Sequence, residues 1–370
     1  MAEREFSYAQ QTWKRLKKNK GAVFGLIIIG LSILVAIFGY LVAPDNSPNA
    51  DLQTVEIQAK KPGYAQQFLK IHDPQNKKRN WLVSLIYGRP LNYHLVPING
   101  EPQYNKSNDS LIVNRYIDEG VSVSQAFAIK SLLENSQDKK NSSLIITKKY
   151  WLGTDKFGRD ILSRLIIGTR VSLAVGFIAV LISLTLGILL GAIAGYYRGK
   201  TDSLIMWLVN VTWSIPTILL VFAITMALGK GFWQVFIAVG LTLWVSVARL
   251  VRGQVMAIRE LEYVQAAKAL GASNSRIIIR HILPNISGPI LVIAAGNFAT
   301  AIMIEAGLSF LGLGIQPPQP SWGLMIKENY NFIITHNPML ALAPGIAIML
   351  LVLAFNLLGN GLRDALNVKA

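Results

Sequence analysis

Six long stretches of this sequence are almost free of charged residues, and each is long enough to cross a lipid bilayer. A membrane-spanning helix needs about 20 mostly apolar residues. We therefore predict transmembrane helices over six ranges: 21–42, 171–195, 204–228, 232–248, 288–311 and 338–358. The third range contains Pro216 and the fifth contains Asn297 and Glu305. Such residues inside a span indicate protein neighbours or a wet cavity.

The first apolar stretch could instead be a cleaved signal peptide. It is longer than the roughly 7–15 apolar residues of a signal-peptide core, and Pro44 follows where a cleavage site would stand. We therefore predict an uncleaved membrane anchor over residues 21–43.

Composition limits the remaining classes of protein. Only 15% of the residues are charged, whereas a soluble domain has about a quarter, yet the net charge is +16. A basic chain can indicate nucleic-acid binding, but the long uncharged stretches favour the lipid bilayer as the partner and exclude nucleic acid. The chain has no cysteine, which excludes disulfides, thiolate catalysis and zinc–thiolate sites.

The distribution of lysine and arginine predicts the orientation in the membrane. If the N-terminus is cytoplasmic, the basic residues concentrate in the cytoplasmic segments, above all in 1–20 and 249–287, and the short outer loops carry very few. This asymmetry predicts a multi-pass protein with both termini in the cytoplasm. The segment between the first two spans is also basic, but it is too long for the rule to apply.

The polar segment 44–150 is predicted to be a small α+β subdomain outside the membrane, because a structureless loop of this length is improbable. We expect strands over 81–87, 93–97 and 144–148, with a turn at Asn99–Gly100. Residues 121–133 have the apolar spacing of a short helix. Residues 158–168 are predicted to form an amphipathic helix at the outer membrane interface.

The long cytoplasmic loop 249–287 has its own pattern. Residues 262–270 have helical composition, and Gly271 is a natural residue to end a helix. A second helix is expected from about Ser273 to just before Pro284. A short, alanine-rich helix with an exposed face suits docking into a groove on another protein, although a solvated connector would look similar.

Three motifs in this chain resemble those of ABC importer permeases. Gln265-Ala266-Ala267, Gly271 and Leu283-Pro284 resemble the EAA loop, with Gln265 in place of an acidic residue and His281 in place of isoleucine. Residues 152–164 and 308–323 resemble two further signatures of the dipeptide/oligopeptide/nickel transport family. The sequence departs from that family in the long segment 45–150, and at Trp207 and Asn210, where the family often has a charged pair.

The resemblance implies an all-α polytopic membrane protein with six transmembrane helices, the type I ABC importer permease fold, and an α+β extracytoplasmic insertion. It implies the second (C-type) permease subunit of an importer in the bacterial cytoplasmic (inner) membrane. The parts would be a tail (1–20), a first helix (21–43), the insertion (44–150) and a permease core (151–370). The chain would form half of a translocation pathway for peptides or related small solutes.

The implied partners are a second homologous permease subunit, two ATP-binding-cassette ATPase subunits and an extracytoplasmic solute-binding protein. The chain itself would have no cofactor and no catalytic residue. It would also have no ATP site, because Gly199-Lys200-Thr201 lacks the earlier glycine of a phosphate-binding loop. The four histidines are too scattered to predict a metal site. The residues expected to couple the loop to the ATPases are Glu262, Gln265, Ala266, Ala267, Gly271, Leu283 and Pro284.

Other residues are weaker candidates. Glu305, Asn297 and Pro216 are candidates for the solute pathway or a gate, and a structural role is favoured for Glu305. Residues 307–323 are expected to form an irregular re-entrant loop on the outer face. Asp155, Arg159, Asp160 and Trp322 are candidates for outer docking, but the charged residues among them are more simply interpreted as a solvated, mutually paired face.

Two other classes of protein stay open. A secondary transporter or channel without ATP coupling would need an internal repeat or several charges within the membrane, and neither is apparent. A membrane-anchored receptor would place its activity in the outer subdomain, which does not account for the long cytoplasmic loop.

Overall fold

A computed structural model of the chain describes residues 8–73, 80–105, 109–132, 144–229, 231–335 and 337–366. It divides into two compact units. The first comprises Met1–Ile33, Val171–Gln316 and Ile346–Ala370, and the second comprises Leu34–Arg170 and Pro317–Gly345.

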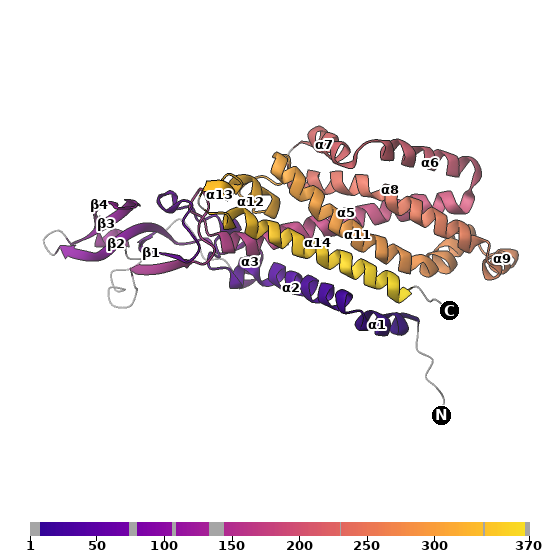
Figure 1. Cartoon of the computed structure of the whole chain (residues 1–370), viewed down its shortest axis with the longest axis horizontal. Coiled ribbons are helices and arrows are strands. Elements are labelled where there is room, and N and C mark those ends of the chain that lie inside the picture. Colours follow the sequence, from indigo (N-terminus) through magenta and orange to yellow (C-terminus); the bar gives the residue numbers. More distant parts are fainter. Residues whose placement is uncertain are drawn as a thin grey trace, which may run out of the picture. The chain divides into compact units, whose positions relative to one another are not determined.

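Long helices account for most of the first unit (Figure 1). The helices that contribute residues to it are α1 (Tyr8–Lys18), α2 (Lys20–Val42), α5 (Ile161–Tyr197), α6 (Gly199–Ser214), α7 (Thr217–Leu228), α8 (Phe232–Arg259), α9 (Glu262–Ala269), α10 (Asn274–Arg276), α11 (Ser287–Leu311) and α14 (Met339–Leu366). Among the described residues, five helical segments are long and apolar enough to cross a membrane, or six if the bent pair α6–α7 counts as one span. Five of the six predicted spans are therefore confirmed as helices.

The predicted third span is broken rather than continuous. Helices α6 and α7 are separated by Ile215 and Pro216 and are bent by 95°. Proline has no backbone N–H and disfavours helical geometry at the preceding residue, and Ile215 accordingly has an extended backbone (φ −91°, ψ 128°). The sequence prediction placed Pro216 inside the span without foreseeing that it would end one helix.

A row of glycines lets α5 and α8 approach each other closely. A Cβ atom added at Gly187, Gly191 or Gly195 would lie 2.4 to 2.7 Å from an atom of α8. Glycines spaced four residues apart lie on one face of a helix and are typical of close helix contacts in membranes. Helix α8 continues well beyond the predicted end at residue 248, because Val251 and Val255 on its far part are fully buried.

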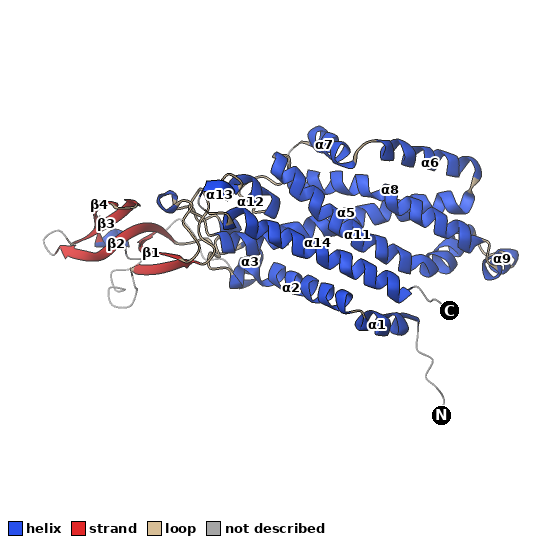
Figure 2. Cartoon of the chain, in the orientation of Figure 1, coloured by secondary structure: helices blue, strands red, loops and turns tan. Residues whose placement is uncertain are grey.

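The second unit contains a five-stranded antiparallel sheet (red in Figure 2). Its strands are β1 (Tyr64–His72), β2 (Tyr93–Asn105), β3 (Ser110–Asp118), β4 (Val121–Ala128) and β5 (Ile145–Tyr150), in the spatial order β4-β3-β2-β1-β5. Short helical segments accompany it: η1 (Pro48–Ala50), η2 (Val55–Ile57), α3 (Trp81–Tyr87), α4 (Ile129–Leu132), α12 (Trp322–Asn329) and α13 (Phe332–Thr335).

The sheet is apolar on both faces. Phe68 and Leu69 are neighbours on the central strand β1 and are both fully buried, so their side chains point to opposite faces. Phe68 belongs to a cluster that includes Ile57 of η2, and Leu69 to a cluster that includes Leu132 of α4. The short helices thus cover the two faces of the sheet.

Two of the expected strands are confirmed, whereas a third expected strand, an expected turn and most of an expected helix are not. Strands β2 and β5 begin within one residue of the predicted starts. Residues 81–87 form the helix α3, and residues 121–128 form the strand β4, in which valine and serine alternate at the two-residue period of a strand. Asn99–Gly100 is no hairpin turn but lies inside β2, where the pairing with β3 shifts between Asn99 and Gln103. Of the helix expected over 121–133, residues 129–132 are helical and form α4, and Leu133 lies outside the described residues.

The separate helix expected over 158–168 is confirmed only for residues 161–168, which are the first residues of the long helix α5. The chain turns at Gly158 (φ +73°), and the helix α5 then begins at Ile161 and runs for 37 residues. Asp160 precedes its first residue and accepts a hydrogen bond from the backbone N–H of Ser163 at 2.9 Å, which is the geometry of an N-cap.

Candidate functional site

The short helix α9 occupies the predicted place in the loop 249–287, between Leu261 and Gly271. Glu262 lies in its first turn and Lys268 in its last, which suits the helix dipole. At the C-terminus, the Gly271 N–H donates to the Lys268 carbonyl at 3.0 Å, and the Ala272 N–H donates to the Ala267 carbonyl at 3.1 Å. This pair of bonds is a Schellman motif, and it requires the positive φ of +80° that Gly271 adopts.

Helix α9 has a narrow attachment to the rest of its unit. Val264 is the one buried residue of α9, which the structure describes in full. It packs in a cluster with residues of α8 and with Ile277. The Tyr263 hydroxyl accepts a hydrogen bond from the Asn285 side chain at 3.1 Å, and Gln265 donates to the Arg259 carbonyl at 2.9 Å.

The remainder of α9 faces outward. Ala266 and Glu262 are exposed, Ala267 is half-buried, and Leu270 just after the helix is 88% exposed. An apolar residue so exposed beside a small alanine provides a contact surface that this chain does not itself cover.

The expected second helix of the loop does not end before Pro284. Helical backbone continues from α10 through a π-helical segment (Ile277–Ile282) and a 3-10 segment (Leu283–Ile286) into α11. Pro284 stands in the first turn of the 3-10 segment, where its missing N–H does not break the helical path. Leu283 packs against the same buried cluster as Val264.

Glu305 lies on α11 and is completely buried. Its Oε1 accepts a hydrogen bond from the Ser309 hydroxyl at 2.6 Å, and that hydroxyl oxygen in turn accepts from the Ile315 N–H at 3.3 Å. Gly312 ends α11 in the left-handed region with φ +85°. Glu305 is thus bonded to the turn that follows its own helix, which is the arrangement expected of a structural role.

Asn297 lies on the same helix and lines a cavity of about 520 Å³ formed with residues of α8 and α14. It is 7% exposed, and its side-chain amide lies 3.5 Å from both the Leu243 carbonyl and the Ser246 hydroxyl on α8. The other polar lining residues are Thr300, Asn356 and Arg363. Pro216 lies elsewhere, at the break between α6 and α7.

Five charged residues of the second unit form one largely buried group, in which only the Asp51 side chain is partly exposed, at 24%. This charge cluster consists of Asp51, Asp155, Arg159, Arg164 and Glu328. The Arg159 guanidinium lies 2.6 Å from Asp155, 2.7 Å from Glu328 and 3.0 Å from Asp51. Arg164 lies 3.5 to 3.8 Å from the same three carboxylates. Burial disfavours the charge on Arg159, but Asp155 and Glu328 outweigh it and raise the pKa of Arg159 above its ordinary value.

The charge cluster corrects the interpretation of this motif as a solvated face. The side chains of Asp155 and Arg164 are 0% exposed and that of Arg159 is 2% exposed. The predicted pairing of Asp155 with Arg159 is present. The other two carboxylates could not be predicted, because Asp51 and Glu328 lie far from this motif in the sequence and belong to no recognisable motif of their own.

Trp322 is likewise enclosed within its unit. It is 3% exposed, and its indole N–H donates to the Leu165 carbonyl at 3.0 Å. Burial of Trp322 and of Asp155, Arg159 and Asp160 argues against a direct docking contact through these four side chains.

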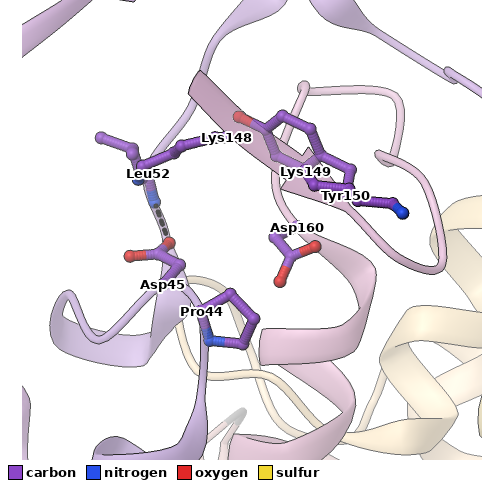
Figure 3. A pocket seen from close by; sticks show the side chains of 7 residues that line it. All are labelled: Pro44, Asp45, Leu52, Lys148, Lys149, Tyr150 and Asp160. Atoms are coloured by element: carbon purple, nitrogen blue, oxygen red, sulfur yellow. Dashed lines mark hydrogen bonds between the residues drawn. The ribbon is translucent and has the colours of Figure 1, made fainter. Parts of the chain in front are cut away.

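A small cavity of about 160 Å³ lies beside Asp160 (Figure 3). Asp45 and Lys148 also line it, and Asp45 is held by the N–H groups of Ser47 (3.0 Å) and Leu52 (3.2 Å). Burial raises the pKa of Asp160 and lowers the pKa of Lys148. Both groups are therefore less readily charged than they would be in water.

Comparison with known proteins agrees with the resemblance predicted from the motifs. Residues 187–369 match the family described as binding-protein-dependent transport system inner membrane component. Residues 7–59 match the N-terminal transmembrane domain of oligopeptide transport permease C. The match over residues 7–59 covers the first span, and the match over residues 187–369 covers the loop that contains α9 and the helices on both sides of it.

Three bacterial proteins show the same similarity over most of their length. A glutathione transport system permease protein of Pectobacterium atrosepticum is 44% identical over 220 residues, covering 60% of this chain and 73% of that protein. A dipeptide transport system permease protein of Alkalihalophilus pseudofirmus is 48% identical over 221 residues, covering 60% and 72%. An oligopeptide transport system permease protein of Bacillus subtilis is 40% identical over 223 residues, covering 60% and 73%.

Proposed function

This chain belongs to the family of inner-membrane components of binding-protein-dependent transport systems, and we propose that it carries peptides or related small solutes across the bacterial cytoplasmic membrane. It is a multi-pass permease subunit of an ABC importer and not itself an enzyme. The solute class rests on relatives whose names specify glutathione, dipeptide and oligopeptide transport. The type I importer fold, with both termini in the cytoplasm, is part of the same proposal.

The working complex in this proposal contains a second homologous permease subunit, two ATPase subunits and a solute-binding protein. Each permease subunit would form half of the pathway. The cavity beside Asn297 on α11 supports a pathway there, because its lining combines apolar side chains with a few polar groups, of which Arg363 is charged. Glu305 takes a structural role, since it is bonded through Ser309 to the turn after its helix.

Helix α9 is the proposed contact with an ATPase subunit. The observation that carries this assignment is the contrast between one buried anchor, Val264, and the exposed surface of Ala266 and Leu270. A small residue and a neighbouring exposed apolar residue suit insertion into a groove. Rigid-body movement of the ATPase subunits would then be transmitted through α9 to α8 and α11.

The test is an arginine at Ala266, with Ile279→Arg as the matched control. Ile279 is 66% exposed and also belongs to the cytoplasmic loop, but it lies outside α9. Ala266→Arg should reduce co-purification of the ATPase chains and abolish ATP-driven uptake in proteoliposomes, whereas Ile279→Arg should retain both. Normal uptake by Ala266→Arg would show that α9 is not the contact.

A second variant tests the turn after α9. An added Cβ at Gly271 meets no atom of this chain within 4 Å, so a large residue there would mainly obstruct a partner and strain the local backbone. Gly271→Trp should separate ATP hydrolysis from transport. Normal coupling in a complex carrying Gly271→Trp would contradict the assignment.

A further inference from the structure

Helix α3 has the reverse of the polarity expected for a helix on a water-exposed subdomain. Its sequence, WLVSLIY, contains no charged residue, and its single polar residue, Ser84, is buried. Five of its six apolar residues are exposed, and Leu85 is half-buried. The exposed ones are Trp81 (71%), Leu82 (56%), Val83 (41%), Ile86 (56%) and Tyr87 (63%). An apolar surface of this kind indicates a partner that is itself apolar.

One arginine ties α3 to the membrane span α2. The Arg170 guanidinium donates to the carbonyls of Leu85 (2.9 Å) and Ile86 (2.7 Å) in the last turn of α3. The same guanidinium donates to the carbonyl of Ile37 in α2 at 3.2 Å and to that of Ala36. The last carbonyls of a helix have no partner within the helix, so Arg170 satisfies those of α3 and complements the negative end of its dipole.

The loop that follows α2 also holds the end of α3. The backbone N–H of Arg89 donates to the Asn46 carbonyl at 2.8 Å. Gly88 fits so closely against this loop that an added Cβ would lie 2.9 Å from its backbone. The last turn of α3 is therefore fixed at both Ala36–Ile37 and Asn46.

These contacts define the depth of α3 relative to the span. Ala36 and Ile37 lie five or six residues before Val42, the last residue of α2, which corresponds to about 7–9 Å along a helix. Helices that lie in a membrane interface bury their apolar face by about 5–10 Å. The neighbouring side chains of α2 are exposed and apolar in the same way: Ile37 (46%), Phe38 (44%), Leu41 (63%) and Val42 (67%).

We propose that α3 is an interfacial membrane helix, with its Trp81–Tyr87 surface inserted into the lipid leaflet at the Val42 end of α2. The partner that covers this surface is the lipid bilayer. The exposed surface of α3 continues the apolar surface of the adjacent span α2, at the depth to which interfacial helices bury their apolar face. Trp81 and Tyr87 stand at its two ends, and tryptophan and tyrosine are the side chains that concentrate at membrane interfaces.

Spin-label accessibility tests this proposal in the assembled complex reconstituted in nanodiscs. The chain has no cysteine, so single cysteines at Leu82 and Ile86 can each carry a unique nitroxide when the partner subunits are free of reactive cysteine. Leu41→Cys provides the lipid reference on α2. Val123→Cys, at a 55% exposed position on β4, provides the water reference.

Labels at residues 82 and 86 should collide more often with oxygen than with a water-soluble nickel chelate, as at residue 41, and the order should reverse at residue 123. An excess of nickel collisions at 82 and 86 would place α3 in water and overturn the proposal. Exclusion of both reagents would show that protein covers α3, which overturns it as well. Neither outcome bears on whether the chain is a permease.

Discussion

Arg159 and Glu328 form a 2.7 Å ion pair although they are 169 positions apart in the sequence. The Arg159 side chain is 2% exposed and that of Glu328 is 8% exposed. Removal of one partner from a buried ion pair is far more damaging than loss of an exposed pair, since it leaves a buried charge without compensation. The charge cluster therefore acts mainly to hold distant parts of one unit together.

Arg159→Met should lower the free energy of unfolding by about 3–5 kcal/mol, because it leaves three carboxylates around Arg164 alone. The measurement is thermal or denaturant unfolding of the purified chain. Arg115→Met is the control, since it removes an ion pair to Glu56 in which Arg115 is 40% exposed, and such pairs contribute about 0–1 kcal/mol. Similar losses in the two variants would contradict the role given to the charge cluster.

Gly158→Ala should destabilise the protein more than Gly63→Ala. Both glycines have positive φ, +73° and +86°, so alanine is strained at either position by about 1–2 kcal/mol. At Gly158 the added Cβ would also lie 1.7 Å from the Thr54 carbonyl oxygen, whereas at Gly63 it meets nothing within 4 Å. Comparison of unfolding midpoints separates the steric effect from the backbone strain, and equal shifts would show that the loop around Thr54 moves aside freely.

Gly191→Ala and Gly253→Ala should change stability in opposite directions. A Cβ at Gly191 of α5 would lie 2.5 Å from the Ala248 carbonyl oxygen of α8, and overpacking of this kind destabilises by about 1–3 kcal/mol. Gly253 lies within α8 with no atom near its added Cβ, so alanine should stabilise the helix by up to about 1 kcal/mol. Thermal unfolding of each variant measures both shifts, and a neutral Gly191→Ala would mean that α5 and α8 are not in close contact.

The stability difference between the wild type and Asp160→Asn should depend on pH. Burial raises the pKa of Asp160 in the folded protein above its ordinary value. The contribution of the protonated Asp160 carboxyl to stability is therefore complete below the ordinary pKa, and it is lost as the pH rises through the pKa of the folded state. Asparagine can still cap α5 but does not titrate. Relative to the variant, the wild type should therefore gain stability as the pH falls from neutral into the acid range. Unfolding measured across that range checks this, and a constant difference would show that the Asp160 carboxyl titrates normally.

The membrane helices and the helix α9 in the loop 249–287 could be predicted from the sequence because their signals are local. Long uncharged stretches located the spans, and the glycine that ends α9 marked its Schellman turn. Pro216 and Pro284 show the limit of such signals. Both are prolines in apolar surroundings, yet one separates two helices bent by 95°, and the other lies within continuous helical backbone.

The predictions failed mainly where long-range packing decides the structure. Residues 81–87 have strand composition, but Arg170 and Asn46 hold them as a helix. Residues 121–128 pair along β3, which supplies the hydrogen bonds that favour a strand. The charged motif at Asp155–Arg164 is buried because Asp51 and Glu328 approach it, and nothing near either residue in the sequence indicates that contact.

The narrow attachment of α9 has a consequence for the time scale of its motions. Eight residues are fewer than the roughly 12–15 at which isolated helices become stable in water, and Val264 is the main apolar contact that α9 makes with its own chain. Helical segments with few buried contacts open locally at a small fraction of the global unfolding energy. The amide hydrogens of α9 should therefore exchange rapidly in the isolated chain. If an ATPase subunit covers Ala266 and Leu270 as proposed, α9 would become stiff enough to transmit force only in the assembled transporter.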